Sequence, residues 1–193
     1  MSTKQSIIEA ATRLFADKGY EGMTMKEIAR EVGIKAPSLY AFFESKEHIF
    51  LHIYRDIIAS HLNLASSDAA SPNASVRQQF EYILRMIMDY QLKESLQMKI
   101  YMRLLLFPPD VFQVDMKAEL LKMEQAEYEL FRAMFKRAMD SGEIKQADSD
   151  ALAIALICMM DGLFWAMQRY DEARFQQHFR TVWEQFWQGI KQD

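Results

Sequence analysis

Apolar residues recur with helical spacing along almost the whole chain, and this periodicity is the strongest constraint on its fold. Near the start, Ile7, Ala10, Ala11 and Leu14 follow the spacing of one helix face. Similar stripes continue to Ile190, with breaks at glycine, proline and polar clusters. Glycine and proline are scarce, with 6 and 4 residues among 193, which disfavours turn-rich β structure. The sequence therefore predicts an all-α fold of about nine helices.

The first 50 or so residues carry start and stop signals for three short helices. A helix over residues 4–17 should end at the following Lys-Gly pair, because glycine favours the position just past a helix end. Thr24 begins a capping-box pattern for a second helix, which Gly33 ends. A third helix is expected over residues 36–43, with Pro37 in its first turn. Two short helices joined in this way predict a helix-turn-helix, whose second helix enters the DNA major groove.

The rest of the chain predicts six longer helices. Expected ranges are 46–64, 95–107 and 110–140. The eighth helix includes an apolar run over 151–167, and apolar stripes over 76–88 and 175–190 indicate the fifth and ninth helices. The small and polar residues 65–75 are the clearest expected loop, and Asp148 is the expected cap of the eighth helix. There is no uninterrupted run of about 18 apolar residues, so a membrane span is not expected.

Net charge alone does not decide whether the chain binds nucleic acid. The whole chain has a net charge of −4, whereas residues 1–50 hold seven basic and seven acidic residues and are neutral. Affinity for DNA must then depend on a few placed cations and helix N-termini rather than on a bulk positive field. The polar residues expected on the third helix are Lys35, Ser38 and Tyr40, while Leu39 and Phe43 should face a small core.

A longer string around these helices resembles the signature of the TetR family of bacterial transcription regulators. It consists of Thr24, Ile28-Ala29, Val32-Gly33-Ile34, Ser38-Leu39-Tyr40, Phe43, Ser45-Lys46-Glu47 and Phe50. The resemblance covers residues 5–54, about a quarter of the chain. It implies a helix-turn-helix DNA-binding domain at residues 1–46 and an effector-binding and dimerisation domain at residues 47–193.

The resemblance also implies which residues contact DNA. They are Thr24, Lys35, Ala36, Pro37, Ser38, Tyr40 and Lys46. The chain departs from the family pattern at two places. It has Pro37 where the family often has Gly, and Ala41-Phe42 where the family often has Tyr-His. For Phe42, phosphate contact and ordinary packing stand as alternatives, and we include it among the candidate contacts.

The function implied is that of a cytoplasmic homodimeric repressor. It would leave a palindromic double-stranded DNA operator when a small apolar or aromatic effector binds. The alternative is a helical protein-interaction module without sequence-specific DNA binding, and the cations and hydroxyls on one short helix favour the regulator. We recognise no catalytic constellation and no cofactor motif, so an enzyme is not expected.

Methionine and aromatic residues are mixed in the second part of the chain. Eleven of the 14 methionines follow residue 80, which suits an adaptable apolar cavity, although the same residues can simply fill a core. The resemblance favours the cavity. The candidate effector-binding residues are Tyr82, Met86, Tyr90, Tyr101, Met102, Phe112, Met123, Tyr128, Phe131, Met160 and Phe164.

The last two helices are the expected dimer interface. The eighth is apolar almost all round, which predicts burial on most sides. Together with their symmetry mates, the two helices would form a four-helix bundle with an isologous contact. The candidate interface residues are Ala155, Gly162, Trp165, Phe179, Trp183 and Phe186.

Three isolated residues within apolar runs need separate interpretation. Arg103 and Asp161 either recognise the polar end of an effector, or pair with each other, a helix end or a second subunit; structural pairing is favoured. The lone cysteine, Cys158, has no neighbouring histidine and is expected to be a small buried hydrophobe.

A possible metal site also has an ordinary alternative. His48, His52 and Asp56 share one face of the fourth helix, which is the spacing of a metal ledge. That face lies opposite the apolar stripe, so a solvated surface is favoured and no metal is expected.

Overall fold

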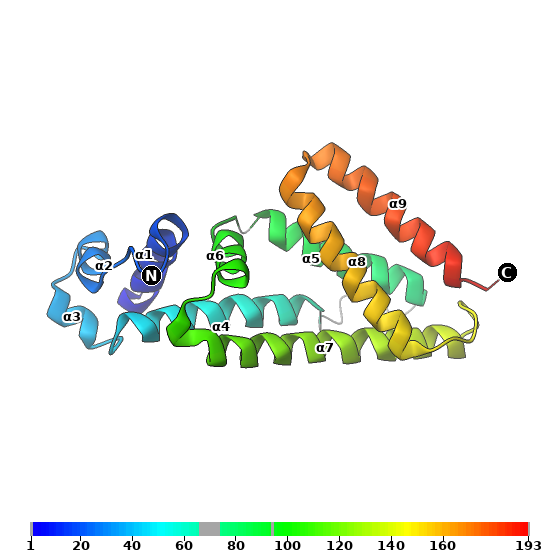
Figure 1. Ribbon diagram of the computed structural model, residues 1–193, viewed down its shortest axis with the longest axis horizontal. Coiled ribbons are helices and arrows are strands. Elements are labelled where there is room, and N and C mark those ends of the chain that lie inside the picture. Colours follow the sequence, from blue (N-terminus) through cyan, green and yellow to red (C-terminus); the bar gives the residue numbers. More distant parts are fainter. Residues whose placement is uncertain (1, 66–73, 94, 193) are drawn as a thin grey trace. The chain divides into compact units, whose positions relative to one another are not determined.

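The computed structural model describes residues 2–65, 74–93 and 95–192, and these form nine α-helices and one 3-10 helix (Figure 1). In chain order these are α1 (Thr3–Lys18), α2 (Met25–Val32), α3 (Ala36–Tyr40), α4 (Lys46–Ala65), α5 (Val76–Lys93), α6 (Ser95–Leu106), η1 (Asp110–Phe112), α7 (Gln113–Asp140), α8 (Ser149–Arg169) and α9 (Glu172–Ile190). The predicted all-α class is confirmed. Most of the loop predicted over residues 65–75 lies outside the described residues.

Local capping chemistry explains several helix ends. Gly19 follows α1 with φ +74°, a conformation that residues with a Cβ rarely adopt. Thr24 and Glu27 form the predicted capping box at the start of α2. At α8, the Asp148 carboxylate accepts hydrogen bonds from the N–H groups of Asp150 and Ala151, which confirms its predicted role.

The helix boundaries predicted at residues 43 and 110 are wrong, and the hydrogen bonds show why. The third helix ends at Tyr40 instead of residue 43, because the Phe42 N–H turns back to the Leu39 carbonyl at 3.0 Å. The seventh helix begins at Gln113 instead of Asp110. The intervening residues form the tight 3-10 helix η1, in which the Phe112 N–H donates to the Pro109 carbonyl at 3.0 Å.

The contacts divide the chain into two compact units, each with its own core. The first unit comprises Met1–Asn63 and Asp89–Met123, and the second comprises Leu64–Met88 and Glu124–Asp193. This division by contacts differs from the functional division expected at residue 46, which stays a prediction.

In the first unit, α1 packs against α2 and α6, and α2 packs against α3. Leu39 and Phe43 are fully buried, as predicted, which fixes the orientation of α3. Phe15 of α1 and Phe50 of α4 meet at a ring-centroid distance of 4.9 Å. The DNA-binding helices predicted from sequence therefore share one core with α4, α6 and the start of α7.

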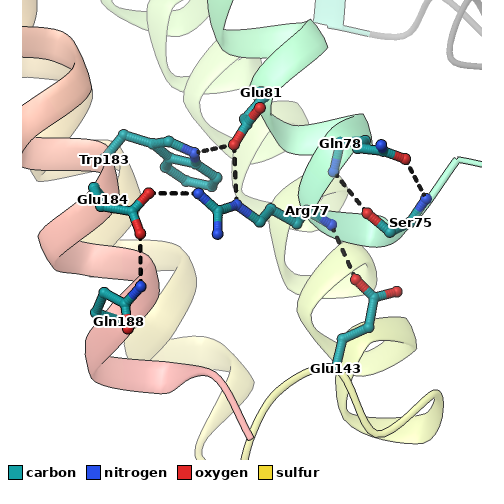
Figure 2. A network of polar contacts seen from close by, with 8 residues as sticks. All are labelled: Ser75, Arg77, Gln78, Glu81, Glu143, Trp183, Glu184 and Gln188. Carbon is teal, nitrogen blue, oxygen red and sulfur yellow. Dashed lines mark hydrogen bonds and ion pairs between the residues drawn. The ribbon is translucent and has the colours of Figure 1, made fainter.

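In the second unit, Phe80, Phe131, Phe135 and Phe175 are almost wholly buried among α5, α7, α8 and α9. A polar network connects α5 to α9 beside this core (Figure 2). Arg77 pairs with Glu81 at 3.0 Å and with Glu184 at 2.5 Å, and the Trp183 indole N–H donates to Glu81 at 2.9 Å. Burial opposes the charged form of Arg77, but the hydrogen bonds to both carboxylates outweigh it and raise the pKa of Arg77.

The expected burial of the eighth helix on most sides is wrong. One face of α8 packs in the core through Ala153, Leu156 and Leu163, while Ile154 on the other side is 55% exposed. Cys158 is also exposed, so its predicted burial is wrong for the same reason. Within the described residues α8 alone is long and apolar enough to cross a membrane, a test that core helices of soluble proteins also pass.

The core of the second unit gives a stability prediction. Replacing Phe80 by Ala should lower the free energy of unfolding by about 3–5 kcal/mol, because the ring is fully buried and its loss leaves a cavity. Urea unfolding followed by circular dichroism measures this change. The control is Phe107→Ala, whose ring is 75% exposed and should cost little. Equal losses for the two variants would contradict the assigned core.

Candidate nucleic-acid interface and ligand cleft

The turn between α2 and α3 is built around Gly33. This residue has φ +76° and ψ +25°, the left-handed conformation that glycine adopts without a Cβ clash. The next N–H, that of Ile34, donates to the Ala29 carbonyl at 2.9 Å and closes the end of α2. The chain then enters α3 through Lys35, with Pro37 in the first turn. The geometry is that of a helix-turn-helix.

The outer face of α3 carries most of the predicted DNA contacts. Tyr40 is 53% exposed and Phe42 is 41% exposed, and Lys35, Pro37 and Ser38 are also exposed. Ala36 is half-buried. The buried side chain of Leu39 holds the opposite face against the core, so the polar face of α3 points to solvent.

Thr24 is exposed at the start of α2, and its hydroxyl already serves the helix cap. The hydroxyl oxygen accepts a hydrogen bond from the Glu27 N–H at 3.3 Å, and the hydroxyl donates to the Glu27 carboxylate at 3.0 Å. Glu27 also pairs with Lys18 at 2.7 Å. The hydrogen bonds from Lys18 and Thr24 favour the ionised form of Glu27 and lower its pKa.

Lys46 does not extend freely into solvent. Its ammonium donates to the Tyr20 carbonyl at 3.0 Å and lies 4.0 Å from the centroid of the Tyr20 ring. The Tyr20 hydroxyl donates to the Glu47 carboxylate at 2.5 Å. Burial and this hydrogen bond raise the pKa of Tyr20, and the same bond lowers the pKa of Glu47. Sequence reasoning missed Tyr20, although an aromatic residue directly after a helix-ending glycine was a usable signal.

The predicted effector residues fall in both units. Tyr101, Met102, Phe112 and Met123 belong to the first unit, where Phe112 and Met123 are buried in the core. Six others belong to the second unit: Tyr82, Met86, Tyr128, Phe131, Met160 and Phe164. Among these, Phe131 is fully buried and Tyr128 donates a hydrogen bond to Asp150. The side chain of Tyr90 lies outside the described part of the structure.

A cleft of about 290 Å³ lies within the first unit, between α4, α6 and α7. Its lining residues are Tyr54, Tyr101, Leu104, Leu105, Pro108, Met116, Lys117 and Leu120. Tyr101 is the one member of the predicted effector set among them. The lining is mainly apolar, and Lys117 adds one cationic group, so the cleft suits an apolar molecule with a polar or anionic end.

The predicted dimer residues divide by burial. Ala155, Gly162 and Trp165 are exposed on α8. Phe179 and Trp183 of α9 are buried in the core of the second unit, and Phe186 is half-buried there. The exposed residues of α8 are therefore the ones that a second subunit can reach in this conformation.

Each charged group that the sequence singled out lies close to other groups of the protein. The Arg103 guanidinium donates to the Phe15 carbonyl at the end of α1, at 3.4 Å. Asp161 is exposed as a residue, yet partial burial of its carboxyl, together with the charge of Glu127, raises its pKa. His52 pairs with Asp56 at 3.1 Å, and no three groups suited to a metal meet among the described residues.

This geometry defines a class of protein: a helix-turn-helix with an exposed recognition helix on a larger helical body. The family profile for bacterial regulatory proteins of the tetR family matches residues 7–53. The biofilm operon icaADBC HTH-type negative transcriptional regulator IcaR of Staphylococcus aureus is 26% identical, over 94% of this chain and 89% of its own length.

Solved structures show the same fold over nearly the whole chain. The TetR family regulator PfmR from Thermus thermophilus covers all of both chains, with a TM-score of 0.70 and 18% identity. FadR from Bacillus subtilis, in complex with stearoyl-CoA, covers 96% of this chain and 98% of its own, with a TM-score of 0.71 and 17% identity. Residues 7–53 thus match the DNA-binding part of the tetR family, and the chain is a DNA-binding transcription regulator.

The exposed position of Lys35 gives a prediction about DNA affinity. Replacing Lys35 by Ala should weaken binding and reduce the slope of log affinity against log salt by about 1, because one phosphate contact is lost. Fluorescence anisotropy over a salt series measures both quantities. Lys122→Ala is the control, since this exposed lysine lies on α7, away from α3 in the chain. An unchanged slope for Lys35→Ala would remove it from the interface.

Proposed function

We propose that the protein is a cytoplasmic homodimeric repressor that leaves its operator when a small apolar or aromatic effector binds. The observation that carries the proposal is the cleft beside α4. Tyr54 of α4 lines it, and the same helix begins at Lys46, next to the helix-turn-helix. The relative IcaR is a negative transcriptional regulator, which supports repression. FadR with bound stearoyl-CoA shows that a protein of this fold holds a small molecule.

The size and lining of the cleft favour a small effector. Its volume of about 290 Å³ is at the lower end of the usual range for ligand pockets, about 300–1,000 Å³. Leu104, Leu105, Met116 and Leu120 supply apolar surface, and the Lys117 ammonium can pair with an anionic group. These features support an aromatic or short-chain carboxylate as the effector class.

Dimerisation through α8 is supported by its exposed apolar face. Ile154 and Trp165 provide apolar area, while Ala155 and Gly162 allow close approach of a second helix. Exposure of this apolar face to water is unfavourable, since the helix has a mean hydropathy of 1.7. A second subunit related by a twofold axis would cover it. The dimer would place two recognition helices about 34–36 Å apart, as a palindrome requires.

The release mechanism follows from this arrangement. An effector in the cleft would shift α4 through Tyr54, and the start of α4 would move with the DNA-binding helices. The recognition helices would then leave the spacing that fits successive major grooves. Binding would thus shift the population between two dimer shapes, of which one fits the operator.

The dimer proposal is tested at Ile154. Replacing Ile154 by Asp should convert the dimer to a monomer, because a charge buried in an apolar interface is strongly unfavourable. Sedimentation velocity measures the molecular mass. The control is Leu121→Asp, at a similarly exposed leucine of α7. A dimer that survives Ile154→Asp would place the interface elsewhere.

The cleft proposal is tested by filling the cleft from its rim. Leu105 is 42% exposed, so Leu105→Trp can enter the cleft without disturbing the core. This variant should lose binding of octanoate and 1-naphthoate in calorimetry, because the indole ring occupies the space of the ligand, while its circular dichroism spectrum stays that of the wild-type protein. Leu106→Trp is the matched control at the neighbouring residue, which does not line the cleft. Equal ligand binding by the two variants would exclude this cleft as the site.

A further inference from the structure

We propose that Phe112, acting through Tyr20, positions Lys46, so that the turn between α6 and α7 sets the affinity for DNA. The inference deepens the proposed function, on which it rests, because it gives a residue-level path from the cleft to a predicted DNA contact. Each step of the path lies within the first unit.

The first step joins Tyr20 to the start of α4. Tyr20 makes contacts with both Lys46 and Glu47 through three different groups: its carbonyl and ring hold the ammonium, and its hydroxyl holds the carboxylate. An ammonium has three N–H donors, and the carbonyl takes one of them. The remaining donors of Lys46 can bind a phosphate at the N-terminus of α4, where the helix dipole already favours an anion. Tyr20 is therefore placed to fix this lysine before DNA arrives.

The second step joins Phe112 to Tyr20. The Phe112 ring lies edge-on to the Tyr20 ring, with centroids 5.0 Å apart, and stacks on Phe50 at 4.8 Å. Phe50 in turn contacts Tyr20 at 5.1 Å. Phe112 is 2% exposed, so its ring has little space in which to move independently of its two partners. A displacement of Phe112 must then change the packing of Tyr20.

The third step joins Phe112 to the cleft. Pro108 and Met116 both line the cleft, and they flank Phe112 in the chain. The 3-10 hydrogen bond from the Phe112 N–H to Pro109 makes this connection short and tight. On the α7 side, the Tyr54 hydroxyl donates to the Met116 carbonyl at 3.2 Å. A molecule that moves the Pro108–Met116 wall will therefore displace Phe112.

The three steps together identify Tyr20 and Phe112 as positioning residues for DNA binding. Neither needs to contact DNA. Their effect on DNA affinity depends on Lys46, whereas a general loss of stability would lower affinity with or without this lysine. If the ring contact is weakened, Lys46 becomes less ordered, and its phosphate contact must then offset additional side-chain entropy.

A double-mutant cycle tests the inference without any ligand. A duplex selected from a random-sequence library by the wild-type protein serves as the probe, and affinities are measured by anisotropy over a salt series. Phe112→Leu should weaken binding roughly three- to tenfold, because part of the binding free energy of one charge-assisted hydrogen bond is lost. In the Lys46→Ala background, Phe112→Leu should have no further effect on affinity or on the salt slope.

Two further variants make the cycle decisive. Tyr20→Leu changes the other end of the ring contact and should show the same dependence on Lys46, even if Phe112→Leu fails to fold. Ile100→Val alters the same core but leaves Tyr20, Phe50 and Phe112 in place, and it should leave DNA affinity unchanged. Losses that are equal with and without Lys46 would overturn the inference. Absence of a response to octanoate or 1-naphthoate would instead count against the proposed effector function.

Discussion

The ring packing of Phe15, Tyr20, Phe50 and Phe112 is the interaction on which the first unit depends. A helix-turn-helix of about 50 residues buries too little apolar surface to be very stable alone. Here its core continues into α4 and the α6–α7 turn through these four rings, and into α6 through Ile100 and Leu104. Because rings of this size resist small displacements, the packing both stabilises the DNA-binding helices and connects them to the cleft.

Electrostatics have a different role from the one usual in DNA-binding proteins. The first 50 residues are neutral, so individual cations must be well placed to contribute. Lys35 is exposed at the start of α3, whereas Lys46 is held by Tyr20. The two lysines thus differ in kind: Lys35 is an exposed candidate contact, and Lys46 is a cation whose position the fold controls.

Local signals in the sequence were enough to predict the helices and most of their ends. Gly19, the Thr24 capping box and Asp148 act through neighbouring backbone groups, so their effects can be predicted without the tertiary structure. The contact of Tyr20 with Phe112 could not be predicted in this way, because it joins residues far apart in the chain. The exposure of Ile154 and Cys158 was also missed, since apolar periodicity does not distinguish a core from a surface that another subunit can cover.

We propose that the exposed face of α3 reads a DNA sequence as part of a twofold dimer. Binding of the purified protein to fragments of its own genome, followed by sequencing of the retained fragments, tests this proposal. We expect enrichment of palindromic sites whose half-sites lie one helical turn, or a multiple of it, apart. Retention of fragments without a common motif, or of sites without twofold symmetry, would contradict it.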